Sequence, residues 1–108
     1  MKRGDVVTVA VTGDYGKPRP AVVVQTNLLN DTHASVVVCL VTSTLLDAPL
    51  LRLTVEPSPR NGLHQRSQIM ADKVVTVRKE KIGARIGVLD EETMLGLSRA
   101  LAFVMGIG

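Results

Sequence analysis

Arg19 is the side chain of this 108-residue chain that is best suited to chemistry, because it lies between two prolines and directly before an apolar run. Each proline fixes its own φ at about −65° and favours extended geometry in the residue before it, so the backbone at Arg19 is stiff. A guanidinium held in this way can bind an anion such as phosphate through two parallel hydrogen bonds. The alternative interpretation is a surface arginine that packs on its own loop.

Other polar side chains fall at the ends of predicted strands, namely Thr42, Ser43, Ser67 and Asp72. Together with Arg19, they are the polar groups that remain as candidates for a functional site. The structural alternative is that they only make hydrogen bonds within turns. The spacing of the residues leaves both interpretations open.

Metal and cofactor sites are not indicated. His33 and His64 are far apart in the sequence, and the single cysteine, Cys39, lies in an apolar run where burial is expected. These residues give no metal-ligand spacing. The chain has no glycine-rich phosphate loop and no dinucleotide-binding fingerprint, so no cofactor is expected. A Ser-His-Asp triad stays possible on composition, although no nucleophile-elbow pattern is present.

The elements that must position these side chains are mainly strands. Runs rich in β-branched residues and bounded by turn residues predict strands at 5–11, 21–26, 35–41, 52–55, 67–71 and 74–78. Asp72 and Lys73 form the junction of the last two. Segments 12–18 and 56–62 have the composition of loops, and residues 79–82 could form one helical turn.

The C-terminal segment changes to a helical period. Met94, Leu97, Leu101 and Val104 follow the 3-4-3 spacing of one helix face, which predicts an amphipathic helix that packs on the core. Asp90 is the predicted N-cap, and a glycine at position 106 is suited to ending the helix. The chain is therefore predicted to form a single domain, residues 1–108, of the α+β class with mostly β structure.

Composition restricts where and how such a domain works. Hydrophobic residues make up 45% of the chain, yet no apolar stretch is long enough for a membrane span. The N-terminal residues do not resemble a secretory signal, and one cysteine cannot form a disulfide within the chain, so a cytoplasmic location is expected.

The charge of the chain is concentrated in one part of it. The formal net charge is +3, and residues 57–89 carry seven basic side chains against two acidic ones. Such a surplus suits a polyanion or an acidic peptide as partner. The alternative is a solvated basic face without a specific partner.

Four blocks of the chain, taken in order, resemble the MazF/PemK family of toxins: 2–7, 16–24, 41–43 and 67–73. These are RNA-cleaving toxins of type II toxin–antitoxin modules. The resemblance implies a small SH3-like β-barrel with a C-terminal helix, the fold shared by CcdB and PemK. It also implies a homodimer whose groove binds single-stranded RNA, an acidic cognate antitoxin, and metal-independent cleavage in which the ribose 2′-hydroxyl attacks the adjacent phosphorus.

The resemblance also implies roles for individual residues. Arg19 would stabilise the phosphate and could also donate a proton. Thr42 would hydrogen-bond to the scissile phosphate, and Asp72 is the candidate general base. Residues expected to contact RNA are Tyr15, Lys17, Ser43, Arg66, Ser67 and Lys73. Tyr15 is the expected stacking platform, because the chain has only two aromatic residues.

The chain departs from the family pattern in two ways. Neither His33 nor His64 lies where a histidine of the family would help catalysis, so both are predicted to be surface residues. Some relatives carry an arginine where this chain has Met70, so a second cation is either missing or supplied by Arg66 or Lys73. Two other functions stay open at this point. One is a CcdB-like poison of DNA gyrase that acts by binding through its C-terminal residues. The other is a dimeric binding module without catalysis.

Overall fold

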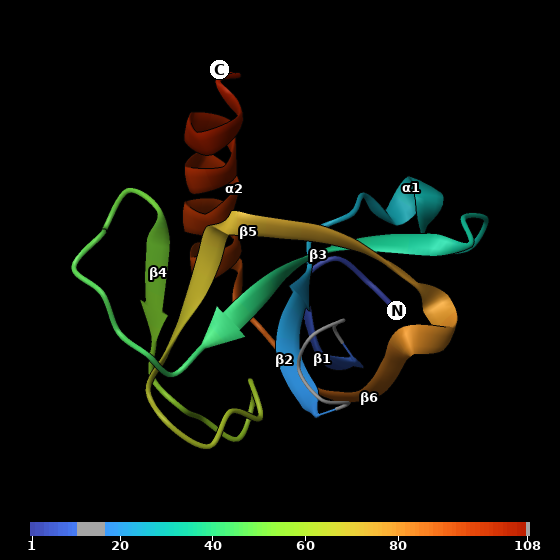
Figure 1. Cartoon of the computed structure of the whole chain (residues 1–108), viewed down its shortest axis with the longest axis horizontal. Helices are drawn as coiled ribbons and strands as arrows, with labels where there is room; N and C mark the ends of the chain where they lie inside the picture. The colour runs from blue at the N-terminus through green and yellow to red at the C-terminus, as the bar shows by residue number, and fades with distance from the viewer. Residues whose placement is uncertain (11–16, 108) are drawn as a thin grey trace.

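The structure, a computed structural model, describes residues 1–10 and 17–107, and its strands form one antiparallel sheet (Figure 1). The order across the sheet is β4-β5-β3-β2-β1-β6. The strands span Asp5–Ala10 (β1), Pro18–Val23 (β2), Ser35–Thr42 (β3), Arg52–Val55 (β4), Ser67–Arg78 (β5) and Ile82–Val88 (β6). Two helices, α1 (Asn27–Asn30) and α2 (Glu91–Met105), and a 3-10 turn at Lys79–Lys81 complete the described elements.

The sheet has a core on each of its two faces. Val6, Val22, Cys39 and Ile69 pack on one face together with Leu97 of α2. The other face buries a set made almost entirely of valine: Val7, Val9, Ala21, Val23, Val36 and Val38. Neighbouring residues of β2 therefore enter different cores, so this strand is covered on both of its faces.

The predicted fold class, mostly β with a C-terminal helix, is confirmed. The sheet is strongly curved but does not close, because β4 and β6 are its edge strands in the described part of the chain. Figure 1 shows β5 bending sharply near its middle, so that its two halves run in different directions. The result is a barrel-like sheet with α2 packed beside β4 and β5.

The expectation of two strands at 67–71 and 74–78 is wrong, because β5 is one strand of 12 residues. Its pairing with β3 shifts between Cys39, which lies opposite Val74, and Val41, which lies opposite Ile69. The junction predicted at Asp72 is therefore a bulge inside a continuous strand, and such bulges bend the strand that carries them.

Other boundaries also differ from the expectations. β2 begins at Pro18, so Arg19 lies within the strand, and the pairing with β1 extends across both prolines. Two elements, β6 and α1, were not predicted. β6 contains two glycines and an alanine, and its strand conformation depends on its pairing with β1. Val11 of the first predicted strand lies outside the described residues.

The helix α2 follows the predicted pattern closely. The Asp90 carboxylate accepts a hydrogen bond from the Thr93 N–H at 2.7 Å, and this bond lowers the pKa of Asp90. Gly106 ends the helix in the left-handed conformation with φ of 71°. Leu97 is fully buried, whereas Val104 is exposed at the far end of the stripe.

Two further properties of the chain follow from its packing. Cys39 is buried as expected, and this burial raises the pKa of its thiol to about 12. Among the described residues, no helix combines the length and the apolar character that crossing a bilayer requires.

Candidate active site

A hollow of about 490 Å³ lies where the first residues of β2 meet the end of β3 and the segment 56–66, and we call it the Arg19 hollow. Its described lining consists of Thr8, Lys17, Pro18, Arg19, Pro20, Val41, Thr42, Ser43, Gly62, Leu63, His64, Gln65, Ser67 and Ile86. The hollow therefore combines two cations, several hydroxyl groups and one imidazole. Such a set of groups is suited to binding a phosphate.

The sheet register explains why Arg19 and Thr42 line the same hollow. β2 and β3 are antiparallel, with Ala21 opposite Leu40. Continuing this register by two residues places Thr42 opposite Arg19, and opposite residues of an antiparallel pair direct their side chains to the same face. Lys17 and Ser43 flank this pair in sequence and also line the hollow. The structure thus brings together four of the predicted site residues at the ends of two strands, and Ser67 at the start of β5 is a fifth that lines the hollow.

The two hydroxyl groups of the predicted site have different hydrogen bonds. Thr42 Oγ1 accepts a hydrogen bond from the Thr44 N–H at 3.1 Å, which leaves the hydroxyl proton available to a phosphate oxygen. Ser67, which is buried, donates its hydroxyl proton to the Gln65 carbonyl at 2.8 Å. Thr42 is therefore better prepared than Ser67 to donate to a bound anion.

Three predicted residues, Asp72, Arg66 and Lys73, are not among those that line the Arg19 hollow. Asp72 pairs with Arg52 of β4, with 3.6 Å between Asp72 Oδ1 and Arg52 Nε. Arg66 pairs with Glu56 at 2.8 Å. Tyr15 lies outside the described residues. The roles predicted for these side chains stay predictions.

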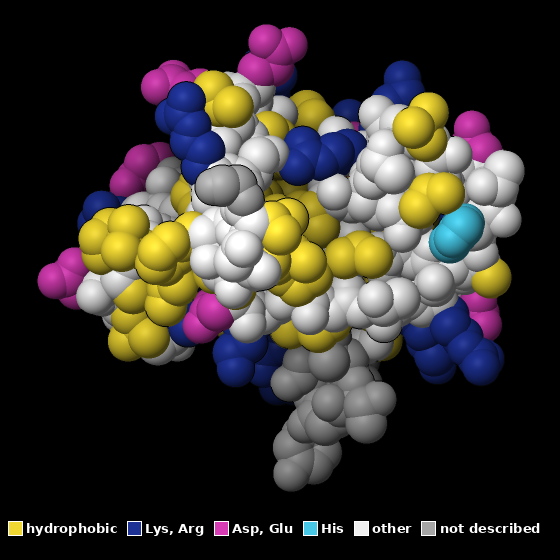
Figure 2. Space-filling view, turned by 90° about the horizontal axis from the view of Figure 1, so that it is seen from above, with side chains coloured by type: hydrophobic (Ala, Val, Ile, Leu, Met, Phe, Trp, Pro, Cys, Tyr) yellow, Lys and Arg dark blue, Asp and Glu magenta, His cyan; other side chains and the backbone are white. Residues whose placement is uncertain are grey.

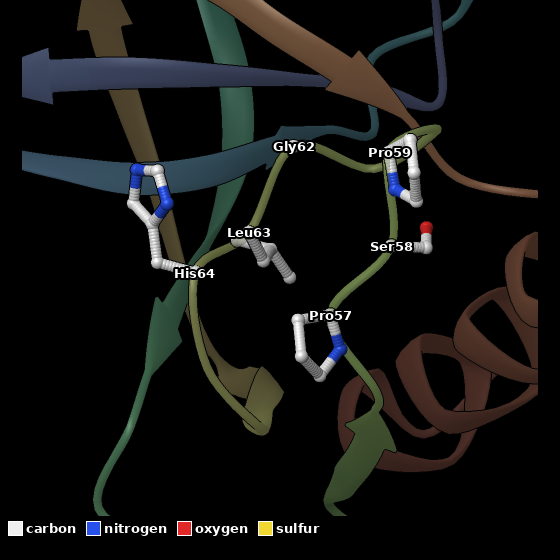
Figure 3. A pocket seen from close by; sticks show the side chains of 6 residues that line it. All are labelled: Pro57, Ser58, Pro59, Gly62, Leu63 and His64. Atoms are coloured by element: carbon white, nitrogen blue, oxygen red, sulfur yellow. The ribbon is translucent and has the colours of Figure 1, made fainter.

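His64 lines the hollow, although the sequence gave no reason to assign it a role there. It is exposed, as predicted, and belongs to the segment 56–66 that leads into β5. The same segment forms a second, shallower pocket with Pro57, Ser58 and Pro59, which shares Gly62, Leu63 and His64 with the Arg19 hollow (Figure 3). No local motif marks this histidine, because only the path of the segment across the sheet brings it near β2.

Asn61 holds the segment 56–66 in one conformation. Its side-chain oxygen accepts hydrogen bonds from the backbone N–H groups of Ser58 and Leu63, both at 3.0 Å. Its side-chain nitrogen donates to the Glu56 carbonyl at 2.9 Å. Asn61 is itself buried, so this hydrogen-bond network fixes the backbone of the segment that includes His64.

Replacing Gly62 by alanine is expected to displace this segment. Gly62 has φ of +70°, and a Cβ placed on it would lie 2.0 Å from the Ile86 carbonyl oxygen. We expect Gly62→Ala to lower Tm by about 5 °C or more, as measured by thermal denaturation.

The matched control for this change is Gly96→Ala in α2. A Cβ there would meet only the flexible end of Leu53 at 3.1 Å, and alanine favours a helix over glycine by about 1 kcal/mol. This control should melt no lower than the unchanged protein. A Gly62→Ala protein whose Tm equals that of the control would contradict the close packing of this segment.

The basic side chains of residues 57–89 do not form one uninterrupted surface. Arg66 pairs with Glu56 and Arg85 pairs with Asp5, so carboxylates from outside this stretch reduce its surplus of charge. Figure 2 shows the Lys and Arg side chains of one face in separate groups, with acidic side chains among them. Within residues 1–10 and 17–107, no three His, Cys, Asp or Glu side chains gather in a way that could hold a metal ion.

Known proteins that resemble this chain do so over nearly its whole length. Residues 2–105 match the model of the family described as PemK-like, MazF-like toxin of type II toxin-antitoxin system. The chain is 44% identical over 108 residues to a probable endoribonuclease MazF of Mycolicibacterium smegmatis, with 99% of this chain and 98% of the relative covered. It is 26% identical to the endoribonuclease EndoA of Bacillus subtilis, with 99% and 96% covered. A mycobacterial endoribonuclease, solved in complex with its cognate antitoxin, superimposes with a TM-score of 0.85 at 27% identity, with 100% of this chain and 97% of that chain covered.

Proposed function

The chain belongs to the family of PemK-like, MazF-like toxins of type II toxin–antitoxin systems, and from this premise we propose that it cuts single-stranded RNA at the Arg19 hollow without a metal ion. The observation that carries the proposal is the meeting of Arg19 and Thr42 at the ends of β2 and β3. Both side chains can bind a phosphate diester, and neither needs a cofactor to do so.

The reaction that fits these groups is an internal transfer at phosphorus. The ribose 2′-oxygen forms a bond to the adjacent phosphorus, and the bond from phosphorus to the 5′-oxygen of the next nucleotide breaks. The products are a 2′,3′-cyclic phosphate and a 5′-hydroxyl end. Arg19 stabilises the charge that grows on the phosphate oxygens, and Thr42 adds a neutral donor. The sequence suggested Asp72 as the base, but its carboxylate pairs with Arg52 and is not among the described residues that line the hollow.

The comparisons do not favour the CcdB-like alternative. The matched family and the curated relatives are endoribonuclease toxins, and their similarity extends over nearly the whole chain. A binding module without catalysis is also less well supported, because the hollow keeps both the predicted arginine and the predicted threonine.

We further propose that two copies of the chain form the RNA groove and that an acidic antitoxin covers it in the cytoplasm. Figure 2 looks down on the C-terminal end of α2 and shows apolar side chains on this face. The exposed large apolar residues include Leu45, Leu46 and Leu50 before β4, and Phe103, Met105 and Ile107 at the end of α2. Exposed large apolar side chains that gather on one face are typical of protein–protein interaction sites. Sedimentation equilibrium that finds only an 11.6 kDa species at micromolar concentration would contradict the dimer.

The experiment that tests the function compares two targets. Purified protein is incubated with a long single-stranded RNA and, separately, with DNA gyrase and relaxed plasmid. We expect the RNA to be cut at a small number of sites and supercoiling to proceed normally. Intact RNA together with inhibited supercoiling would reverse the choice between the two classes of toxin.

A further inference from the structure

The reaction proposed above needs a proton acceptor for the 2′-hydroxyl, and the Arg19 hollow contains one candidate in its described lining. Lys17 and Arg19 are cations, the side chains of Thr8, Thr42, Ser43 and Ser67 are neutral hydroxyls, and Gln65 is an amide. Imidazole is the side chain that both accepts and releases protons near neutral pH. His64 is the one described lining residue that carries it.

The position of His64 agrees with this role. Figure 3 shows its ring extending away from Pro57 and Pro59 and toward the ribbon of β2, the strand that carries Arg19. The ring and Arg19 line the same hollow, so a phosphate bound by the guanidinium would share this hollow with the imidazole. The network around Asn61 fixes the backbone of this segment, although the ring itself stays open to substrate.

We propose that His64 is the general base of RNA cleavage by this chain, an inference that rests on the proposed endoribonuclease function. An imidazole nitrogen takes the proton of the 2′-hydroxyl while the 2′-oxygen bonds to phosphorus. The departing 5′-oxygen takes its proton from water. The imidazolium then returns its proton to solvent, so no proton is gained or lost over the cycle.

The charges around His64 come from few groups. The cations of the described lining are Lys17, which directly precedes β2, and Arg19 in β2. The lining residues of β1, β3, β5 and β6, together with Ser43 directly after β3, carry no charge: Thr8, Val41, Thr42, Ser43, Ser67 and Ile86. In the segment of His64 itself, Glu56 is paired with Arg66. No carboxylate belongs to the described lining, so none there competes with the imidazole for the proton.

The test compares His64→Gln with His33→Gln, a change of the other exposed histidine, which is not among the residues that line the hollow. We expect His64→Gln to lower the rate of RNA cleavage about 100-fold, the lower end of what a general base contributes. The acidic limb of the pH–rate profile should disappear in this variant. His33→Gln should keep both the rate and the profile. Imidazole added to His64→Gly should restore part of the rate, which a merely structural role would not allow.

A second substrate separates the two proton transfers. RNA with sulfur in place of the 5′-bridging oxygen has a leaving group that needs no proton, so His64→Gln should stay slow on it if His64 is the base. Recovery of the rate on this substrate would overturn the assignment. A His64→Gln protein as active as His33→Gln, with an unchanged profile, would also overturn it while leaving the endoribonuclease function intact. A wild-type protein that cuts no RNA would instead refute the proposed function, and this inference with it.

Discussion

Replacing Arg19 by alanine is expected to reduce RNA cleavage at least about 100-fold, the cost of removing one preorganised donor to a transition-state charge. The negative charge on the phosphate oxygens grows as the 2′-oxygen adds to phosphorus, and Arg19 is the charged group that β2 holds at this point of the hollow. The strand supplies the preorganisation, because Pro18 and Pro20 restrict the backbone on both sides. Single-turnover cleavage of a defined RNA measures the effect.

Two variants control this prediction. Arg19→Lys should recover only part of the rate, since an ammonium keeps the charge but loses the planar arrangement of donors. Arg78→Ala removes an exposed arginine that pairs with Glu80 away from the hollow, and it should keep the full rate. Arg19 is exposed, so Tm should change little in Arg19→Ala. An Arg19→Ala protein that cuts RNA at nearly the normal rate would show that the chemistry takes place elsewhere.

The strands and the helix could be predicted where local rules decide the conformation. Valine runs predicted the strands β1 to β3, and helical spacing with an N-cap and a terminal glycine predicted α2. The structure contains these elements. β6 carries no such signal, because its glycines and alanine form a strand only when β1 is available to pair with it. The bulge in β5 likewise depends on the partner strand, so the sequence around Asp72 suggested a break instead.

The candidate site could be predicted in part for the same reason. Arg19 and Thr42 stand at strand ends, where local sequence marks them, and the antiparallel register then brings them together. That Asp72 does not line the hollow could not be predicted, because its position depends on the bulge in β5 and on the ion pair with Arg52. His64 was missed because its proposed role depends on the path of the segment 56–66. Local hydrogen bonds of Asn61 fix the shape of this segment, and the close packing of Gly62 on Ile86, which is distant in sequence, fixes its place on the sheet.

An RNA with a deoxyribose at the cleavage site is expected to resist the protein completely. The proposed reaction uses the 2′-oxygen of that nucleotide as nucleophile, and the substitution removes it while leaving the phosphate, the bases and the rest of the chain unchanged. A deoxyribose one nucleotide away is the matched control, and this RNA should be cut at nearly the normal rate. The comparison separates loss of the nucleophile from weaker binding, because both RNAs lose one 2′-hydroxyl.

The most direct test of the account is therefore cleavage of these two RNAs and their unmodified parent in the presence of EDTA, with the product ends identified by mass. The account predicts that the parent and the control are cut and that their upstream fragments end in a 2′,3′-cyclic phosphate. It also predicts that the RNA with deoxyribose at the cleavage site stays intact. Cleavage of that RNA at the same bond, or loss of all cleavage in EDTA with recovery on adding a divalent metal, would contradict it.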